Sequence, residues 1–282
     1  MKKYYYYLLS LLFVALALSV ELKEDNQDST KSENGKSLIK DRNHRTPKKK
    51  VVRDAFDEVI KDFKKIDGLF TIYWKEEDAD AYLEIQPEQL DKIYLCNVSR
   101  QSGDAYMFDS GAMLKNFPFY FKKVGGNIQF IEENVRFRAE PDAAISRAVE
   151  KNLSDSMKGS TKIISKPHPE TGAILVDAKD LFLQDVGLVS VITGARRRKF
   201  KFDQRNSYFS ELKSFPQNTE IEVTLHFKSE KPQGFYTLPD SRSMLHKYHY
   251  SLAEIPESDY QPRLADDRIG HFLTMYQDYT SL

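Results

Sequence analysis

A two-residue alternation of apolar and polar side chains in the C-terminal part of the chain limits what this sequence can fold into. Glu220, Glu222, Thr224 and His226 alternate with Thr219, Ile221, Val223, Leu225 and Phe227. Met244, His246, Tyr248 and Tyr250 alternate in the same way with Leu245, Lys247 and His249. Successive side chains of a strand point to opposite faces, so this period predicts half-buried strands. The sequence therefore favours the α+β class with mainly antiparallel β structure.

Residues 105–282 are predicted to form a larger β-rich domain with a few helices. Gly125 and Gly126 predict a tight hairpin turn between two strands. Pro141 and Asp142 predict the start of a helix, and residues 180–186 predict one or two helical turns. Residues 161–165, 173–176 and 199–203 predict further strands. An aromatic content of 12% agrees with a β-rich body.

Residues 51–100 are predicted to form a small N-terminal unit of one helix and several strands. Apolar residues recur at helical spacing between Val52 and Ile66, and Gly68 ends this pattern. Residues 69–74, 81–85 and 93–98 then predict short strands. We expect two neighbouring domains, divided between residues 100 and 105.

The N-terminal segment predicts export. Lys2 and Lys3 precede an apolar run, and the small residues Ala17 and Ser19 offer a cleavage site, so residues 1–19 predict a signal peptide. An uncleaved membrane anchor is the alternative. Residues 20–50 are polar and predict a disordered linker. We expect a periplasmic, outer-membrane-associated or extracellular protein, with no membrane contact beyond this peptide. Cys96 is the single cysteine, so no internal disulfide is expected.

Charge and motifs exclude several classes of function. Lys plus Arg and Asp plus Glu both number 42, which disfavours a nucleic-acid partner. None of the histidines is followed by Glu, so the helical His-Glu-x-x-His zinc motif is missing from the sequence. The P-loop, dinucleotide-binding and Gly-x-Ser-x-Gly patterns are missing too. We assign no catalytic residue from the sequence.

His246, His249 and Asp266 are the best metal-ligand candidates. The two histidines are close in sequence, and Asp266 could fold near them. On a strand, however, a spacing of three residues directs His246 and His249 to opposite faces, which favours structural roles.

The C-terminal end carries a second predicted strand, from Ile269 to Tyr279, expected to neighbour the strand at residues 244–250. Between the two strands, Asp266, Asp267 and Arg268 either pair within a turn or, with His271, line the cleft of a neighbouring domain. The sequence looks interrupted after this strand. An unpaired final strand predicts self-association of the chain.

Long phrases of the sequence resemble one family. Among them are VIKDFKKIDGLFTIYW, YLEIQPEQLDKIYLCNVS, NSYFSELKSFPQNTEIEVTLHF and RLADDRIGHFLTMYQDYTS. They resemble the N-terminal part of large bacterial zinc-dependent metalloproteases of the Bacteroidetes type, which carry two domains of unknown function before the catalytic domain. The resemblance implies a zinc site with the motif His-Glu-x-x-His-x-x-Gly-x-x-His downstream of this chain. No cofactor is expected in the chain itself, and zinc is expected only in the missing catalytic domain.

Three hypotheses follow. The first is a truncated or split family member, whose β-rich region packs against a metzincin-like peptidase domain, or a neighbouring gene product, and shapes its cleft. The second is a free-standing periplasmic binding or interaction module without enzymatic activity. The third, a hydrolase of another type, requires histidine and carboxylate groups that converge in the fold.

Overall fold

The computed structural model describes residues 53–261, 266, 268, 270 and 275–280. The predicted signal peptide, with Ala17 and Ser19, and the whole of the predicted linker lie outside these residues. Residues Val51–Leu282 form one compact unit. Among the described residues, no helix has the length and apolar character needed to span a membrane.

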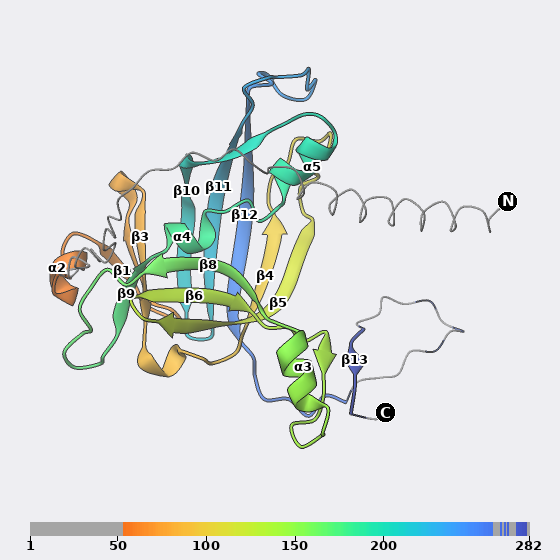
Figure 1. Cartoon of the computed structure of the whole chain (residues 1–282). Helices are drawn as coiled ribbons and strands as arrows, with labels where there is room; N and C mark the ends of the chain where they lie inside the picture. Colours follow the sequence, from red (N-terminus) through yellow and green to blue (C-terminus); the bar gives the residue numbers. More distant parts are fainter. Residues whose placement is uncertain (1–52, 262–265, 267, 269, 271–274, 281–282) are drawn as a thin grey trace, which may run out of the picture. The chain divides into compact units, whose positions relative to one another are not determined.

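The main element of the unit is a seven-stranded antiparallel sheet (Figure 1). Its strand order is β10 (Lys201–Phe215), β11 (Asn218–Lys228), β12 (Ser243–Glu254), β4 (Tyr94–Arg100), β5 (Met113–Val124), β6 (Asn127–Glu132) and β8 (Ser156–Lys162). Figure 1 shows β6 and β8 running across the direction of β10, β11 and β12, so the sheet is strongly twisted. The predicted class, mainly antiparallel β with a few helices, is confirmed.

A second, four-stranded antiparallel sheet has the order β1 (Lys64–Ile66), β2 (Ile72–Lys75), β3 (Asp80–Ile85) and β9 (Ile174–Asp177). Two short strands, β7 (Phe137–Arg138) and β13 (Gln277–Asp278), pair in parallel. The helical elements are short and lie in the connections. They are α2 (Phe56–Ile60), α3 (Ser146–Asn152), α4 (Lys179–Phe182), α5 (Val189–Ala195) and the 3-10 turns η1 (Glu76–Asp78) and η2 (Pro87–Gln89).

One hydrophobic core joins the two sheets. Phe70, just before β2, is completely buried, and its ring lies 5.0 Å from the ring of Tyr94 and 5.4 Å from that of Phe121. Phe119 and Phe130 extend these ring contacts along β5 and β6. Aromatic rings in edge-to-face contact stabilise a core beyond their buried area, so these contacts tie residues near β2 to the seven-stranded sheet.

The division between residues 100 and 105 is not seen in the structure. Strand β4 lies inside the seven-stranded sheet, between β12 and β5, and β3 pairs with β9. Residues 94–100 therefore pair with β5, the next strand in the chain, and with β12, which lies far along it. Local periodicity predicted these strands, but it carries no information about such distant partners.

The predicted helix between Val52 and Ile66 is present only over Phe56–Ile60 among the described residues. Helix α2 ends at Ile60, and Lys64–Ile66 pairs with β2 as strand β1. Phe56 is buried beside Tyr73 and Ala173 in a small second cluster. The apolar residues of this segment thus face a core, as the helical pattern predicted. Its last three residues, Lys64–Ile66, form strand β1 instead of continuing the helix.

The prediction that the final strand of the chain neighbours β12 is also wrong. Strand β12 is paired on both sides, with β11 and with β4, while Gln277–Asp278 pairs with β7. The rest of the predicted final strand, from Ile269 to Thr274, lies almost entirely outside the described residues. Among the described residues, the last strand pairs with β7 on one side, and self-association of the chain stays a prediction.

Other local predictions differ in detail. The hairpin at Gly125 and Gly126 is confirmed, and Gly125 has a φ of 59°. Helix α3 begins at Ser146 rather than at Pro141, and helix α5 was not predicted. Strand β10 is much longer than expected, and its pairing with β11 is interrupted between Asp203 and Tyr208. This irregularity shapes the site described next.

Candidate functional site

The metal-ligand candidates from the sequence do not come together. His246 is completely buried on one face of β12, whereas His249 lies on the other face, where its Nε2 is 2.6 Å from Oε2 of Glu220. Asp266 instead accepts a hydrogen bond of 2.9 Å from Nε of Arg268, which is the pairing expected within a turn. In the described part of the chain, no group of three or more His, Cys, Asp or Glu side chains could hold a metal. The other cleft-lining candidates, Asp267 and His271, lie outside the described residues.

His246 has a buried partner that the sequence did not indicate. Its Nε2 lies 3.2 Å from Oδ2 of Asp104, and both atoms are buried. The other oxygen of Asp104 accepts the backbone N–H groups of Tyr106 and Met107. Burial lowers the pKa of His246 to about 4, against the raising effect of Asp104. His246 is therefore a neutral core residue near pH 7.

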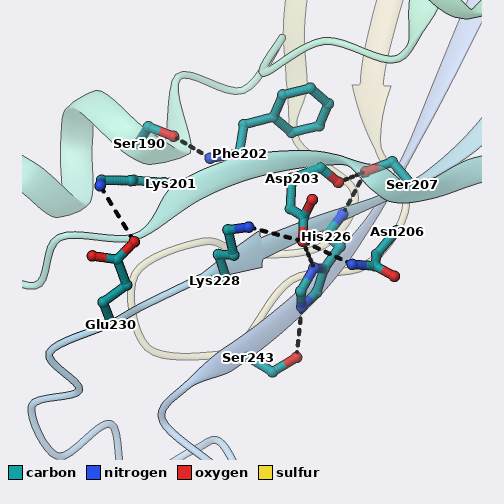
Figure 2. A network of polar contacts seen from close by, with 10 residues as sticks. All are labelled: Ser190, Lys201, Phe202, Asp203, Asn206, Ser207, His226, Lys228, Glu230 and Ser243. Carbon is teal, nitrogen blue, oxygen red and sulfur yellow. Dashed lines mark hydrogen bonds and ion pairs between the residues drawn. The ribbon is translucent and has the colours of Figure 1, made fainter.

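A row of polar side chains crosses three adjacent strands (Figure 2). Asp203 on β10 lies opposite His226 on β11, and its Oδ2 is 3.2 Å from Nδ1 of the ring. The other ring nitrogen, Nε2, lies 2.9 Å from Oγ of Ser243 at the start of β12. We call Asp203, His226 and Ser243 the polar row. Asp203 is 7% exposed and Ser243 is exposed, so the row leads from a buried carboxylate to a solvent-facing hydroxyl.

The interruption of β10 holds the polar row in place. Asn206 donates a hydrogen bond of 2.8 Å to Oδ2 of Asp203, and Nζ of Lys228 lies 3.6 Å from the same oxygen. Ser207 accepts the backbone N–H of His226 and donates to the backbone oxygen of Asp203. Three neighbours lower the pKa of Asp203. The hydrogen bond from Asn206 has the largest effect, and the contact with His226 and the charge of Lys228 add to it. Asp203 is thus a carboxylate at neutral pH.

This arrangement defines what the row can do chemically. A carboxylate beside Nδ1 favours the tautomer of His226 with its proton on Nδ1. Nε2 then accepts a hydrogen bond from the Ser243 hydroxyl and can take its proton. Carboxylate, imidazole and serine in this order and geometry are the components of nucleophilic serine chemistry.

A partly exposed aromatic cluster includes two residues of the connection between β11 and β12. The ring of Phe235, which is buried, is 5.1 Å from that of Tyr106, and the ring of Tyr236 is 5.0 Å from that of Tyr106. The guanidinium of Arg198 lies over the rings of Tyr106 and Phe235 at 5.6 and 5.5 Å. Tyr106 is 42% exposed and Tyr236 is 81% exposed. We call Tyr106, Arg198, Phe235 and Tyr236 the aromatic cluster.

The loop of residues 229–242 joins β11, which carries His226, to β12, which begins at Ser243, and it contains Phe235 and Tyr236 of the aromatic cluster. The loop is closed at its base by the hydrogen bond from Ser229 N–H to the Arg242 oxygen, next to Ser243. Within the loop, Phe235 N–H donates to Ser241. Glu230 pairs with Lys201 of β10, as Figure 2 shows. We call the row, the cluster and this loop the loop end.

A short basic run from Arg196 to Lys199 follows helix α5. Arg196, Arg197 and Lys199 are exposed to solvent. Arg198 differs, because it stacks on the aromatic cluster and donates to the backbone oxygens of residues 233 and 234. The sequence offered no signal for this contact, since residues 106, 198 and 235 meet only in the fold.

The fold and the loop end thus define a mainly antiparallel β domain that carries a surface of exposed aromatic rings. A family model described as Domain of unknown function (DUF5117) matches residues 111–282, more than half of the chain. The chain belongs to this family. No curated protein and no solved structure matches the chain.

Proposed function

We propose that residues 51–282 are the non-catalytic, partner-binding region of an exported zinc-dependent metalloprotease-like protein. The loop end would contact a metzincin-like peptidase domain, encoded with this chain or by a neighbouring gene, and shape its cleft. Zinc belongs, in this proposal, to the peptidase domain alone. The resemblance of long sequence phrases supports the choice of partner, and membership of a family of unknown function is compatible with it.

The observation that carries the proposal is the aromatic cluster. Tyrosine and arginine are enriched in the centres of protein interfaces, where large rings bury much area at little conformational cost. Tyr236 exposes most of its surface to solvent, yet its ring is already ordered against Tyr106. A preorganised, exposed aromatic surface of this kind favours binding, because less side-chain entropy is lost when a partner covers it.

Replacement of Tyr236 by alanine should weaken binding of the peptidase domain about 30-fold, equal to about 2 kcal/mol. The substitution removes an exposed ring that the partner would cover, and it leaves the hydrophobic core unchanged. The two proteins, produced separately, would be compared by biolayer interferometry. Tyr260→Ala is the matched control, because Tyr260 is 68% exposed and follows the opposite end of β12.

Equal weakening by Tyr236→Ala and Tyr260→Ala would contradict the loop end as the binding surface. Absence of binding to the peptidase domain, with binding of another exported protein through Tyr236, would favour the free-standing interaction module instead.

A second candidate function, ester hydrolysis by Ser243, is favoured by the polar row. In this reaction Ser243 Oγ forms a bond to the carbonyl carbon and gives its proton to Nε2 of His226. The leaving alkoxide takes that proton, and water then releases the acyl group from Ser243 by the reverse sequence. Asp203 is the positioning residue that keeps Nε2 directed toward Ser243.

A fluorophosphonate should label Ser243 selectively, because its oxygen displaces fluoride from phosphorus while His226 accepts the proton. Peptide mass spectrometry would locate the adduct. Ser251, on the same strand, is the internal control, because its hydroxyl donates to Glu220 instead of contacting a histidine. His226→Gln should reduce labelling at least tenfold. Labelling of Ser243 at the level of Ser251, or unchanged labelling in His226→Gln, would exclude this function.

A further inference from the structure

A separate cavity of about 220 Å³ lies between the sheet and the segment that joins α4 to α5. It is remote in sequence from the loop at residues 229–242 and has no role in the proposed function. Strands β5, β6, β8 and β12 all contribute to its wall. The lining residues that matter here are Lys115, Phe117, Phe130, Lys158, Leu181 and Tyr250.

The inner wall of the cavity is apolar. Phe130 and Leu181 are each 2% exposed, and the hydroxyl of Tyr250 donates to the backbone oxygen of Phe182 rather than standing free. At the rim, Met157 is 61% exposed and Leu188 is 48% exposed. An apolar ligand in the cavity would remove part of these rim side chains from water, which is favourable in proportion to the area covered.

Two lysines line the same cavity. Nζ of Lys158 lies 3.0 Å from Oε2 of Glu132 and 5.2 Å from the centre of the Phe117 ring. Lys115 is half-buried and makes no ion pair with any described residue. The cavity therefore combines one neutralised cation with one that lacks a counter-charge.

Among the described residues that line the cavity, the one carboxylate, that of Asp185, is already engaged. Both oxygens of Asp185 accept backbone N–H groups, from Val189 at 2.7 Å and from Ser190 at 2.8 Å. These bonds at the start of α5 stabilise the negative charge where it stands. Because both of its oxygens accept these hydrogen bonds, Asp185 does not serve as the counter-ion of Lys115.

We propose that this cavity binds a monocarboxylate with a short apolar tail. The carboxylate lies beside Lys115, with Lys158 as the second cation, and the tail lies against Phe117, Phe130 and Leu181. An apolar pocket with a few converging polar groups is the usual form of a small-molecule site. A charge-assisted contact to an unpaired lysine supplies the orientation of the ligand.

The electrostatics of Lys115 agree with this assignment. Burial, followed by the proximity of Lys158, lowers the pKa of Lys115. A bound anion would offset both effects, because it places an opposite charge beside the Lys115 ammonium group. Perturbed lysines of this kind are characteristic of functional sites.

Isothermal titration of the full chain with octanoate tests the proposal. Octanoate should bind at one site, whereas n-octanol has only the tail and inorganic phosphate only the charge, so each should bind at least tenfold more weakly. Lys115→Gln should weaken octanoate binding at least tenfold, and Lys115→Arg should retain most of it. Lys123→Gln is the matched control, since Lys123 is exposed on the same strand, β5.

A second variant leaves the buried wall of the cavity intact and changes only its exposed rim. Met157→Glu places a carboxylate at the exposed rim and should also weaken octanoate binding, with unchanged circular dichroism. Octanol binding as tight as octanoate binding would overturn the proposal, because the lysines would then have no role. Phosphate binding of equal strength, no octanoate binding, or equal octanoate binding by wild type and Lys115→Gln would overturn it as well.

Discussion

Replacing Phe70 with alanine should lower the free energy of unfolding by about 3–5 kcal/mol, the range for deleting a buried phenylalanine ring. Phe70 is completely buried and contacts Tyr94 of β4 and Phe121 of β5. Its backbone is held independently, because its N–H donates to Thr219 and its oxygen accepts from Ser214. The substitution thus leaves a cavity between the two sheets while the chain path remains fixed.

Urea unfolding provides the measurement. Trp74 is the single tryptophan and lies in β2, so its fluorescence reports the four-stranded sheet, whereas far-ultraviolet circular dichroism is dominated by the larger sheet. Both transitions should shift together to lower urea. Phe215→Ala, at a position 46% exposed, should cost less than about 1 kcal/mol and is the control. A shift of the fluorescence transition alone would mean that the N-terminal segment folds separately.

Acidification from pH 6.5 to pH 4 should destabilise the protein through His246. Its folded pKa is lowered to about 4 from an ordinary value of 6.5, chiefly by burial. The unfolded state therefore binds the proton first, so the stabilisation is fully present above pH 6.5 and is lost as the pH falls toward 4. From this difference, the loss is up to about 3 kcal/mol.

The comparison that isolates His246 is the pH dependence of urea unfolding in wild type and in His246→Gln. The variant should be less stable at pH 7 but should lose much less stability between pH 6.5 and pH 4. His249 acts in the opposite direction, because the Glu220 carboxylate beside its Nε2 raises its pKa, so its contribution is lost as the pH rises. Parallel curves for wild type and His246→Gln would show that burial does not set the protonation of His246.

The sequence predicted the strands with clear alternation. Residues 219–227 and 244–250 are strands in the structure because every second side chain enters the core. The place of β4 between β12 and β5 could not be predicted, since hydrogen bonding between distant segments leaves no local pattern. The region of helix α2 shows another kind of error. The helical spacing of its apolar residues predicted a helix up to Ile66, but Lys64–Ile66 pairs with β2 as a strand.

The candidate site was less accessible to sequence reasoning than the fold. His226 was recognisable only as an outward-facing position of a strand. Its contacts depend on the register that places Asp203 opposite it and Ser243 on the next strand. Likewise, Arg198 meets Tyr106 and Phe235 only because α5, the β11–β12 loop and the segment after β4 converge. Histidines close in sequence, His246 and His249, were the stronger sequence signal but face opposite sides of β12.

Hydrogen exchange is the most direct test of the loop end as a binding surface for a peptidase domain. Backbone amides of the chain would be followed with and without the separately produced domain. We expect exchange at residues 229–242, and around Tyr106 and Arg198, to slow at least tenfold in the complex, with β8 at the other edge of the sheet unchanged. Protection confined to other regions, or none at a domain concentration that saturates binding, would contradict the proposed function.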